Sequence, residues 1–123
     1  DAARVAIVSL FKSKSMLSKF NRLKSDKDFK NVFKNGKTLE NQFFRVKFLK
    51  NRQGFSRFGF IISAKLLKKA TARNVLKRRL RAISRTLIKD LKSNYDIVIW
   101  PKTNSTSAYY KELASNLHDL LSF

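Results

Sequence analysis

Cysteine is absent from this chain of 123 residues, and histidine occurs once, as His118. Without a thiol the chain cannot form a disulfide, a thiolate nucleophile or a thiolate zinc site. One imidazole cannot complete a catalytic triad, so we interpret His118 as a polar position on the last helix. The sequence also has no Gly-rich phosphate loop and no cluster of carboxylates suited to Mg²⁺. We therefore predict no catalytic residue and no metal ligand in the protein itself.

Proline and glycine are also scarce, with one and three residues, so low-complexity linkers are excluded. No apolar run approaches the roughly 20 residues that span a bilayer. Apolar residues nevertheless make up 43% of the chain and include eleven Phe, which predicts a folded domain with a core. Residues 1–15 lack the basic leader of a signal peptide. We interpret them as an extension that precedes a single domain over residues 16–123, which starts at Met16.

Acidic residues are few as well: 8 Asp and Glu face 28 Lys and Arg, a formal net charge of +20. None of the acids lies in residues 41–89, a segment that holds 15 of the basic residues. A distribution this uneven indicates one basic face and not only a soluble surface. It favours a polyanionic partner, either a nucleic acid or an anionic membrane.

Capping and periodicity predict a first helix. Ser25 with Asp28 three residues later resembles a capping box, and Asn35-Gly36 is typical of a helix end. Between them the apolar residues recur at helical spacing. These residues are Phe29, Val32 and Phe33.

Two strands and a hairpin are predicted next. Apolar and basic residues alternate over Phe44–Phe48, the period of a strand with one solvated face. We interpret Lys50–Gly54 as a hairpin loop and Arg57–Ser63 as the returning strand. Tyr95–Trp100 is continuously apolar except for one acid and precedes Pro101, which predicts a central strand buried on both faces.

A long helix is expected to begin between residues 68 and 72 and to end near Leu91, and a last helix begins near Ser107. The order is then helix, two or three strands, helix, strand, helix. This order predicts the α+β class, a two-layer α/β sandwich in which helices pack on a small central sheet.

The long helix divides into an apolar and a basic side. One stripe at 100° per residue contains Leu76, Leu80, Ile83, Leu87 and Leu91. The opposite side holds Asn74, Arg78, Arg81 and Arg85, flanked by Arg73, Lys77 and Arg79. A basic face can be merely solvated, but then acids one turn away usually neutralise it. No acid does so here, and guanidinium forks pair with phosphates, so we predict that this side binds a polyphosphate chain. Lys65, Lys68 and Lys69 add charge where the chain enters the helix.

Phe29 and Phe33 admit two interpretations. Their spacing of four residues is the ordinary signature of core packing. Aromatic side chains beside basic strands also stack on unpaired bases, and Arg45, Lys47 and Arg57 would then supply charge to the backbone of the nucleic acid.

The stretch Lys65–Arg81, KLLKKATARNVLKRRLR, resembles the signature of the protein subunit of bacterial ribonuclease P. That signature is an Arg-Asn-Arg core followed by Lys-Arg and a further Arg. Arg73-Asn74, Lys77-Arg78 and Arg81 match it, whereas Val75 replaces the third residue of the core. The N-terminal pattern also matches, at Asn21-Arg22-Leu23, Asp28-Phe29, Val32-Phe33 and Gly36.

The resemblance implies a function and a set of contacts. In that family a catalytic RNA removes the 5′ leader of precursor tRNA with bound Mg²⁺, and the protein binds that RNA and the leader. It implies a cytoplasmic protein, with one copy per catalytic RNA and no membrane partner, and a left-handed crossover in the fold. The expected contacts to the catalytic RNA are Lys65, Lys69, Arg73, Asn74, Lys77, Arg78 and Arg81. The expected contacts to the single-stranded leader, in a cleft between the sheet and the first helix, are Phe29, Phe33, Phe44 and Lys47.

Other classes of protein share some of these features. A small basic ribosomal protein has the same size, charge and lack of chemistry, and it would not rescue precursor cleavage at low Mg²⁺. A membrane-surface protein would expose its apolar stripe opposite the basic face. A nuclease acting alone would need the catalytic groups that this sequence lacks.

Overall fold

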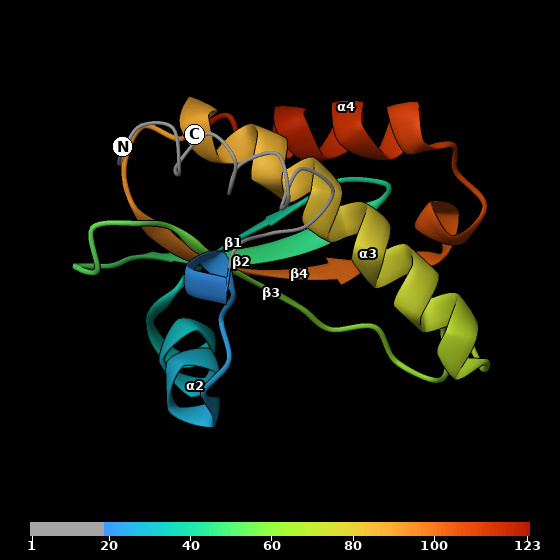
Figure 1. The fold of residues 1–123 in the computed structure, drawn as a ribbon, viewed down its shortest axis with the longest axis horizontal. Coiled ribbons are helices and arrows are strands. Elements are labelled where there is room, and N and C mark those ends of the chain that lie inside the picture. The colour runs from blue at the N-terminus through green and yellow to red at the C-terminus, as the bar shows by residue number, and fades with distance from the viewer. Residues whose placement is uncertain (1–18) are drawn as a thin grey trace, which may run out of the picture.

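A computed structural model describes residues 19–123 (Figure 1). The predicted extension over residues 1–15 and the start at Met16 lie outside these residues. The described elements are η1 (Lys19–Asn21), α2 (Asp26–Asn35), β1 (Lys37–Glu40), β2 (Phe44–Lys50), β3 (Arg57–Phe60), α3 (Ala70–Leu87), η2 (Ile88–Asp90), β4 (Tyr95–Pro101), η3 (Thr103–Thr106) and α4 (Tyr110–Leu120).

The four strands form one mixed sheet in the order β1-β2-β4-β3. β4 pairs antiparallel with β2 and parallel with β3, so the prediction of a central strand is confirmed. The predicted hairpin between β2 and β3 is wrong, because β4 lies between them. Alternation identifies a half-buried strand but not its neighbour, and β4, which is buried on both faces, takes the position with a partner on each side.

β1 follows directly from α2, and Gly36 makes this connection possible. A Cβ at this position would lie 2.5 Å from the carbonyl oxygen of Val32 and 3.0 Å from that of Phe48. Glycine is needed here for close approach of two backbones, since its φ of −78° is available to any residue. The helix end predicted at Asn35-Gly36 is confirmed, as is the cap at Ser25, whose hydroxyl accepts from the Asp28 N–H at 3.2 Å.

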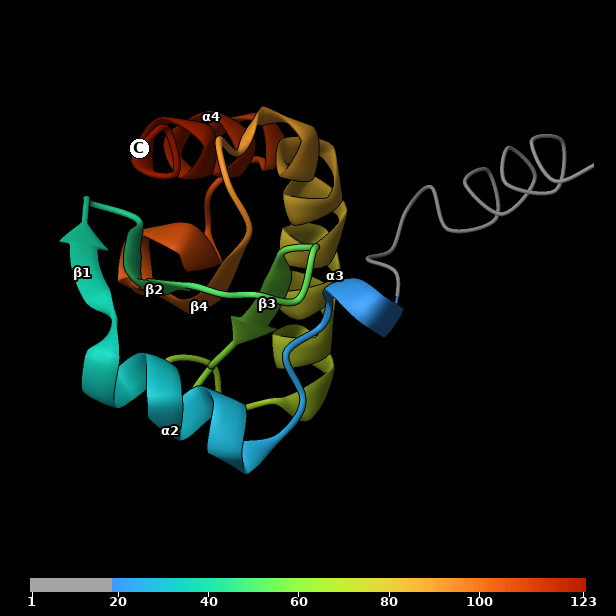
Figure 2. The same ribbon diagram turned by 90° about the vertical axis from the view of Figure 1, so that its left-hand side faces the viewer.

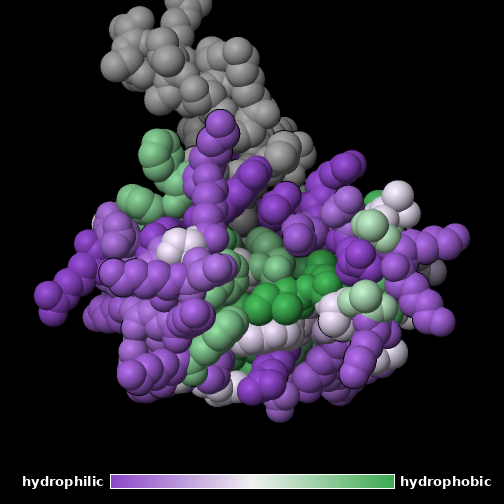
Figure 3. Space-filling view, turned by 90° about the horizontal axis from the view of Figure 1, so that it is seen from below, coloured by the Kyte–Doolittle hydropathy of each residue, from purple (hydrophilic) through white to green (hydrophobic). Residues whose placement is uncertain are grey.

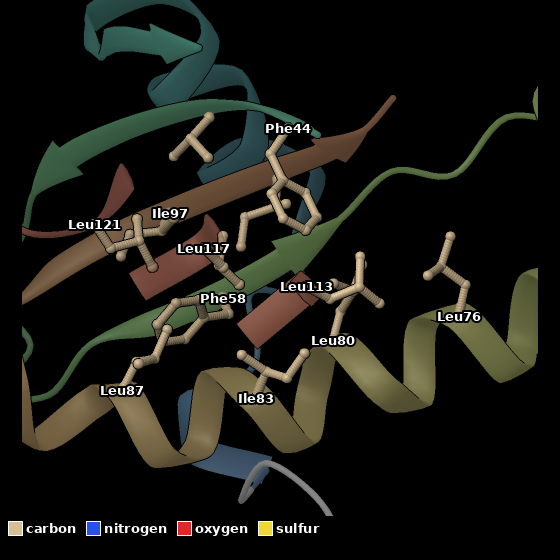
Figure 4. Close-up of a cluster of buried hydrophobic side chains, with 12 residues drawn as sticks. Phe44, Phe58, Leu76, Leu80, Ile83, Leu87, Ile97, Leu113, Leu117 and Leu121 are labelled. Carbon is tan, nitrogen blue, oxygen red and sulfur yellow. The ribbon is translucent and has the colours of Figure 1, made fainter. Parts of the chain in front are cut away.

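Helices cover both faces of the sheet, which Figures 1 and 2 show with α2 on one side and α4 on the other. Alternation along β2 directs Phe44 and Val46 toward α3 and α4, where they join the larger core cluster (Figure 4). Arg45 and Lys47 therefore face the α2 side. There a smaller cluster forms around Leu23, Val32 and Val98. The predicted α+β sandwich with helices packed on the sheet is confirmed.

Two helix boundaries differ from the predicted ones. α3 ends at Leu87 and is followed directly by the 3₁₀ turn η2, so the α-helix is shorter than predicted. α4 begins at Tyr110 and not near Ser107, because Ser107 caps the end of the turn η3 and Tyr109, in an extended conformation, caps the start of the helix. The Glu112 carboxylate accepts from the Tyr109 N–H at 3.3 Å, which fixes this helix start.

Candidate nucleic-acid interface

The basic side of α3 is directed away from the core. Leu76, Leu80 and Ile83 are buried against the sheet, while Asn74 and Arg78 on the opposite side are exposed. The 18 residues of α3 contain no Asp or Glu and extend over about 27 Å. We call the basic residues of α3, together with Asn74, the arginine face. It comprises Arg73, Asn74, Lys77, Arg78, Arg79, Arg81 and Arg85.

Arg73 has a structural role in addition to its charge. Its guanidinium Nη1 donates to the carbonyl oxygens of Leu67 at 2.7 Å and of Lys68 at 2.8 Å. These bonds hold the segment before α3 against the first turn of the helix. Lys65, Lys68 and Lys69, which are exposed, are thereby positioned beside the start of the arginine face.

Lys77 and Arg81 turn toward the edge of β3 and line a pocket of about 280 Å³. Arg22 and Lys24 complete its basic rim, and its wall includes Gly59. Burial lowers the pKa of Arg81, and the positive charge of Arg22 lowers that pKa further. Like charges held this close, with no acid among the lining residues, make the pocket suited to a phosphate group.

Arg22 reaches this pocket because the chain before α2 extends the sheet. Arg22 forms a parallel bridge with Phe58, and the Leu23 N–H donates to the Phe58 carbonyl at 2.8 Å. Within residues 19–123, the buried Nε of Arg22 has no hydrogen-bond partner. Neither Arg22 nor Lys24 is predicted from the sequence as an RNA contact, since three-residue turns and single bridges leave no periodic signal.

The two phenylalanines of α2 lie differently. The Phe29 ring lies directly over Gly59, where a Cβ would be 2.5 Å from its Cε1 and Cζ atoms. Phe33 is 38% exposed, and its ring centroid lies 6.1 Å from that of Phe29 and 5.6 Å from that of Trp100. Phe29 therefore packs on the sheet, as the core interpretation predicted, and Phe33 offers its ring to solvent.

The cations of β2 lie next to these rings. The Lys47 Nζ donates to the Phe33 carbonyl oxygen at 2.6 Å, which places a positive charge at the C-terminal end of α2. Arg45 is exposed, and its guanidinium carbon lies 5.4 Å from the centre of the Trp100 ring. Figure 3 views this face, where apolar surface in the middle is flanked by hydrophilic side chains. The structure thus brings Phe29, Phe33 and Lys47 together.

The predicted leader contact at Phe44 is wrong, and Arg57 does not have the free charge that the base-stacking interpretation of the phenylalanines requires. Phe44 has no exposed surface and lies on the other face of the sheet, in the larger core cluster, because the alternation along β2 separates it from Lys47. Arg57 is 15% exposed and binds the carboxylates of Asp96 at 2.7 Å and Asp28 at 3.1 Å. Its hydrogen bonds to Asp96 raise the pKa of Arg57. Neither side chain is available to a nucleic acid.

Three further observations concern other functions. His118 is exposed and lies 3.8 Å from Asp90 and 3.9 Å from Asp119. Over residues 19–123, no three acidic, His or Cys side chains gather as metal ligands would. Of the helices described, none has the length and hydropathy to span a bilayer.

Comparison with known proteins links the chain to one family. The family model described as Ribonuclease P matches residues 17–122. The "Ribonuclease P protein component" of Clostridioides difficile is 35% identical over 106 residues, which cover 83% of this chain and 92% of the relative. The ribonuclease P protein of Thermotoga maritima matches with a TM-score of 0.75 and 35% identity, over 82% of this chain and 94% of that one. That of Staphylococcus aureus gives a TM-score of 0.72 at 25% identity, over 82% and 92% of the two chains.

Proposed function

The chain belongs to the family of ribonuclease P protein components, and on this premise we propose how its surfaces serve the removal of 5′ leaders from precursor tRNA. The chain acts as the protein subunit of a ribonucleoprotein endonuclease whose catalytic centre is RNA. It works in the bacterial cytoplasm, with one protein per catalytic RNA, and its domain spans residues 16–123.

The arginine face binds the catalytic RNA. A rigid helix presents several cations at one-turn intervals, and each phosphate contact releases condensed counterions. Arg73 contributes mainly by holding residues 65–69, which carry three lysines, in place, since its guanidinium already bonds to two carbonyl oxygens. Arg22 and Lys24 extend the contact around the pocket at the edge of β3. The residues of the RNA surface are Lys65, Lys69, Arg73, Asn74, Lys77, Arg78 and Arg81.

The surface between α2 and the sheet binds the single-stranded leader. Phe33 presents a partly exposed ring, Phe29 forms the packed wall beside it, and Lys47 adds charge. A flexible strand can lie along such a surface by stacking and charge, with little readout of its sequence. Holding the leader allows the complex to distinguish precursor tRNA from the mature product.

Mg²⁺ acts through the RNA subunit. The carboxylates of the described residues do not converge on one point, and Asp96 and Asp28 are bound to Arg57. When bound by the RNA, Mg²⁺ supplies Lewis-acid chemistry to the phosphodiester. The protein contributes positive charge along the RNA backbone, which lowers the concentration of Mg²⁺ that the complex needs.

The observation that carries this proposal is the arginine face of α3, which has no acid among its 18 residues. The test is cleavage of precursor tRNA by a bacterial ribonuclease P RNA at limiting Mg²⁺, with and without the protein. We expect cleavage only with both components, and none by the protein alone. Equal cleavage with and without the protein, together with tight binding to ribosomal RNA, would overturn the proposal in favour of a ribosomal role.

A further inference from the structure

The only tryptophan of the chain, Trp100, lies near the end of β4, where the sheet meets Phe33 of α2. Trp100 is the cross-strand partner of Arg45 on β2, so the two side chains leave the same face of the sheet side by side. The Arg45 guanidinium carbon lies 5.4 Å from the centre of the indole ring. The Phe33 ring also lies against the indole, with the two ring centroids 5.6 Å apart and the planes inclined by 35°.

Three planar groups therefore meet at one place on the α2 face: the Phe33 ring, the Trp100 indole and the Arg45 guanidinium. We call them the stacking cluster. Trp100 is partly buried and packs against the smaller apolar cluster, which anchors it. Phe33 and Arg45 are exposed, which leaves flat surface open to solvent.

Packing alone does not account for Arg45. None of the ion pairs of residues 19–123 includes it, although an exposed guanidinium on a sheet often pairs with a carboxylate on the neighbouring strand. Its cross-strand partner on β1 is Glu40, whose ion pair is with Lys102 at 3.4 Å, and its partner on β4 is the indole, a face on which a guanidinium stacks. The arrangement keeps a planar cation beside an aromatic pair, which suits a ligand that is flat and negatively charged at its edge.

We propose that the stacking cluster binds one unpaired nucleobase, with its plane against Phe33 and Arg45 and its phosphate near the Arg45 charge. This inference rests on the proposed function and deepens it, because it assigns the leader a stacking position on the sheet. Every base has a π face, so the cluster accepts all four bases and favours the larger purines. Lys47 adds little base selectivity, since its ammonium bonds to the Phe33 carbonyl.

The first experiment uses the emission of Trp100, because no other tryptophan contributes to it. The full chain is titrated with a short unstructured oligoadenylate, and binding is followed in parallel by the anisotropy of a label on the RNA. We expect the emission to change in step with anisotropy. The matched ligand is an abasic ribose-phosphate oligomer of equal length, which should bind by charge and leave the emission unchanged. A saturating oligoadenylate without effect on emission, or equal effects of both ligands, would overturn the inference.

The second experiment separates planarity from charge. Arg45→Lys keeps the charge but removes the planar group, at an exposed position where the fold does not depend on it. We expect affinity for oligoadenylate to fall about fivefold or more and affinity for the abasic oligomer to stay the same. Trp100→Phe should weaken oligoadenylate binding in the same selective way. The control is Tyr109→Ala, at an 80% exposed aromatic beside α4, which should change neither affinity.

The outcomes distinguish this inference from the function on which it rests. A protein that rescues cleavage at limiting Mg²⁺, but whose Arg45→Lys variant binds both ligands as the unchanged chain does, contradicts the stacking cluster alone. A protein that fails to rescue cleavage contradicts the proposed function, whatever its emission does.

Discussion

Arg57 shows how one basic residue of this chain stabilises the fold and does not bind RNA. It connects β3 to β4 through Asp96 and to α2 through Asp28, and its bonds to Asp96 are formed by both Nε and Nη2. The Asn51 amide also donates to Asp96 at 2.8 Å, so this carboxylate is fully engaged. With side chains 15% and 5% exposed, the Arg57–Asp96 pair lies largely out of solvent.

Arg57→Ala should therefore lower the free energy of unfolding by about 3 kcal/mol, because it leaves the Asp96 charge buried and unpaired. Urea denaturation measures this change. The matched control is Glu40→Gln at the exposed pair with Lys102, which should cost less than about 1 kcal/mol. If Arg57→Ala left the stability unchanged and weakened RNA binding, Arg57 would be a nucleic-acid contact after all.

At the scale of single residues, the sequence predicted which helical side chains are exposed better than it predicted what the strand side chains contact. Arg78 and Phe33 lie on exposed surfaces, as their expected roles require, because periodicity on a helix identifies the outward side. Phe44 is predicted as a leader contact, and Arg57 is a source of charge only in the base-stacking interpretation, but their environments depend on which face of the sheet and which neighbouring strand they meet. The alternation along β2 already places Phe44 and Lys47 on opposite faces, whereas no local pattern shows that Arg57 meets Asp96 and Asp28.

At the scale of the elements, the position of α2 against the sheet depends on one residue of β3, Gly59. The Phe29 ring lies over Gly59 of β3, with no room for a side chain there. This contact fixes how closely α2 approaches the sheet, and hence where Phe33 lies relative to Trp100.

Gly59→Ala should displace the Phe29 ring and tilt α2, at a cost of about 1–3 kcal/mol in stability. Because α2 forms one wall of the surface proposed to bind the leader, the variant should also bind precursor tRNA more weakly while binding mature tRNA as before. Comparative binding of the two tRNAs measures this, under conditions where the variant is folded. Gly54→Ala is the control: it strains a backbone with φ of 82° but meets no neighbouring atom, so it should affect stability alone. Equal losses for both tRNAs with Gly59→Ala would contradict this role of α2.

Element type was predictable to a larger extent than element pairing. Ser25, the leucine stripe of α3 and the apolar β4 gave local signals, and each identified its element. β1 has only four residues and an irregular burial pattern, so it gave no such signal. The partners of β2 and β3 are set by long-range packing, which also explains why the expected hairpin between them does not form.

The charge of the whole molecule acts in opposite directions on folding and on binding. A net charge of +20 on a body of 123 residues repels itself, and salt screens that repulsion. Salt also competes with the protein for the phosphates of RNA.

We therefore expect the free energy of unfolding to rise between 0.05 and 0.5 M KCl, on the order of the range over which exposed charges become screened, while RNA affinity falls steeply. Denaturant unfolding and RNA binding at the same salt concentrations test this. Arg78→Ala should reduce the slope of log affinity against log salt by about one, since it would remove one of the proposed phosphate contacts. Parallel loss of stability and affinity with salt would show that attraction within the fold outweighs repulsion.

The order of the strands has a consequence for how the chain is made. β4, which separates β2 from β3, is translated after both of them and after α3. Until about residue 101 has left the ribosome, the nascent chain has two sheet fragments with no strand to join them, so the centre of the sheet is completed late. Meanwhile residues 41–89, which contain 15 basic residues and no acid, emerge beside ribosomal RNA. The basic segment is therefore made before the strand that joins β2 to β3, so it meets RNA before the sheet that supports it is complete.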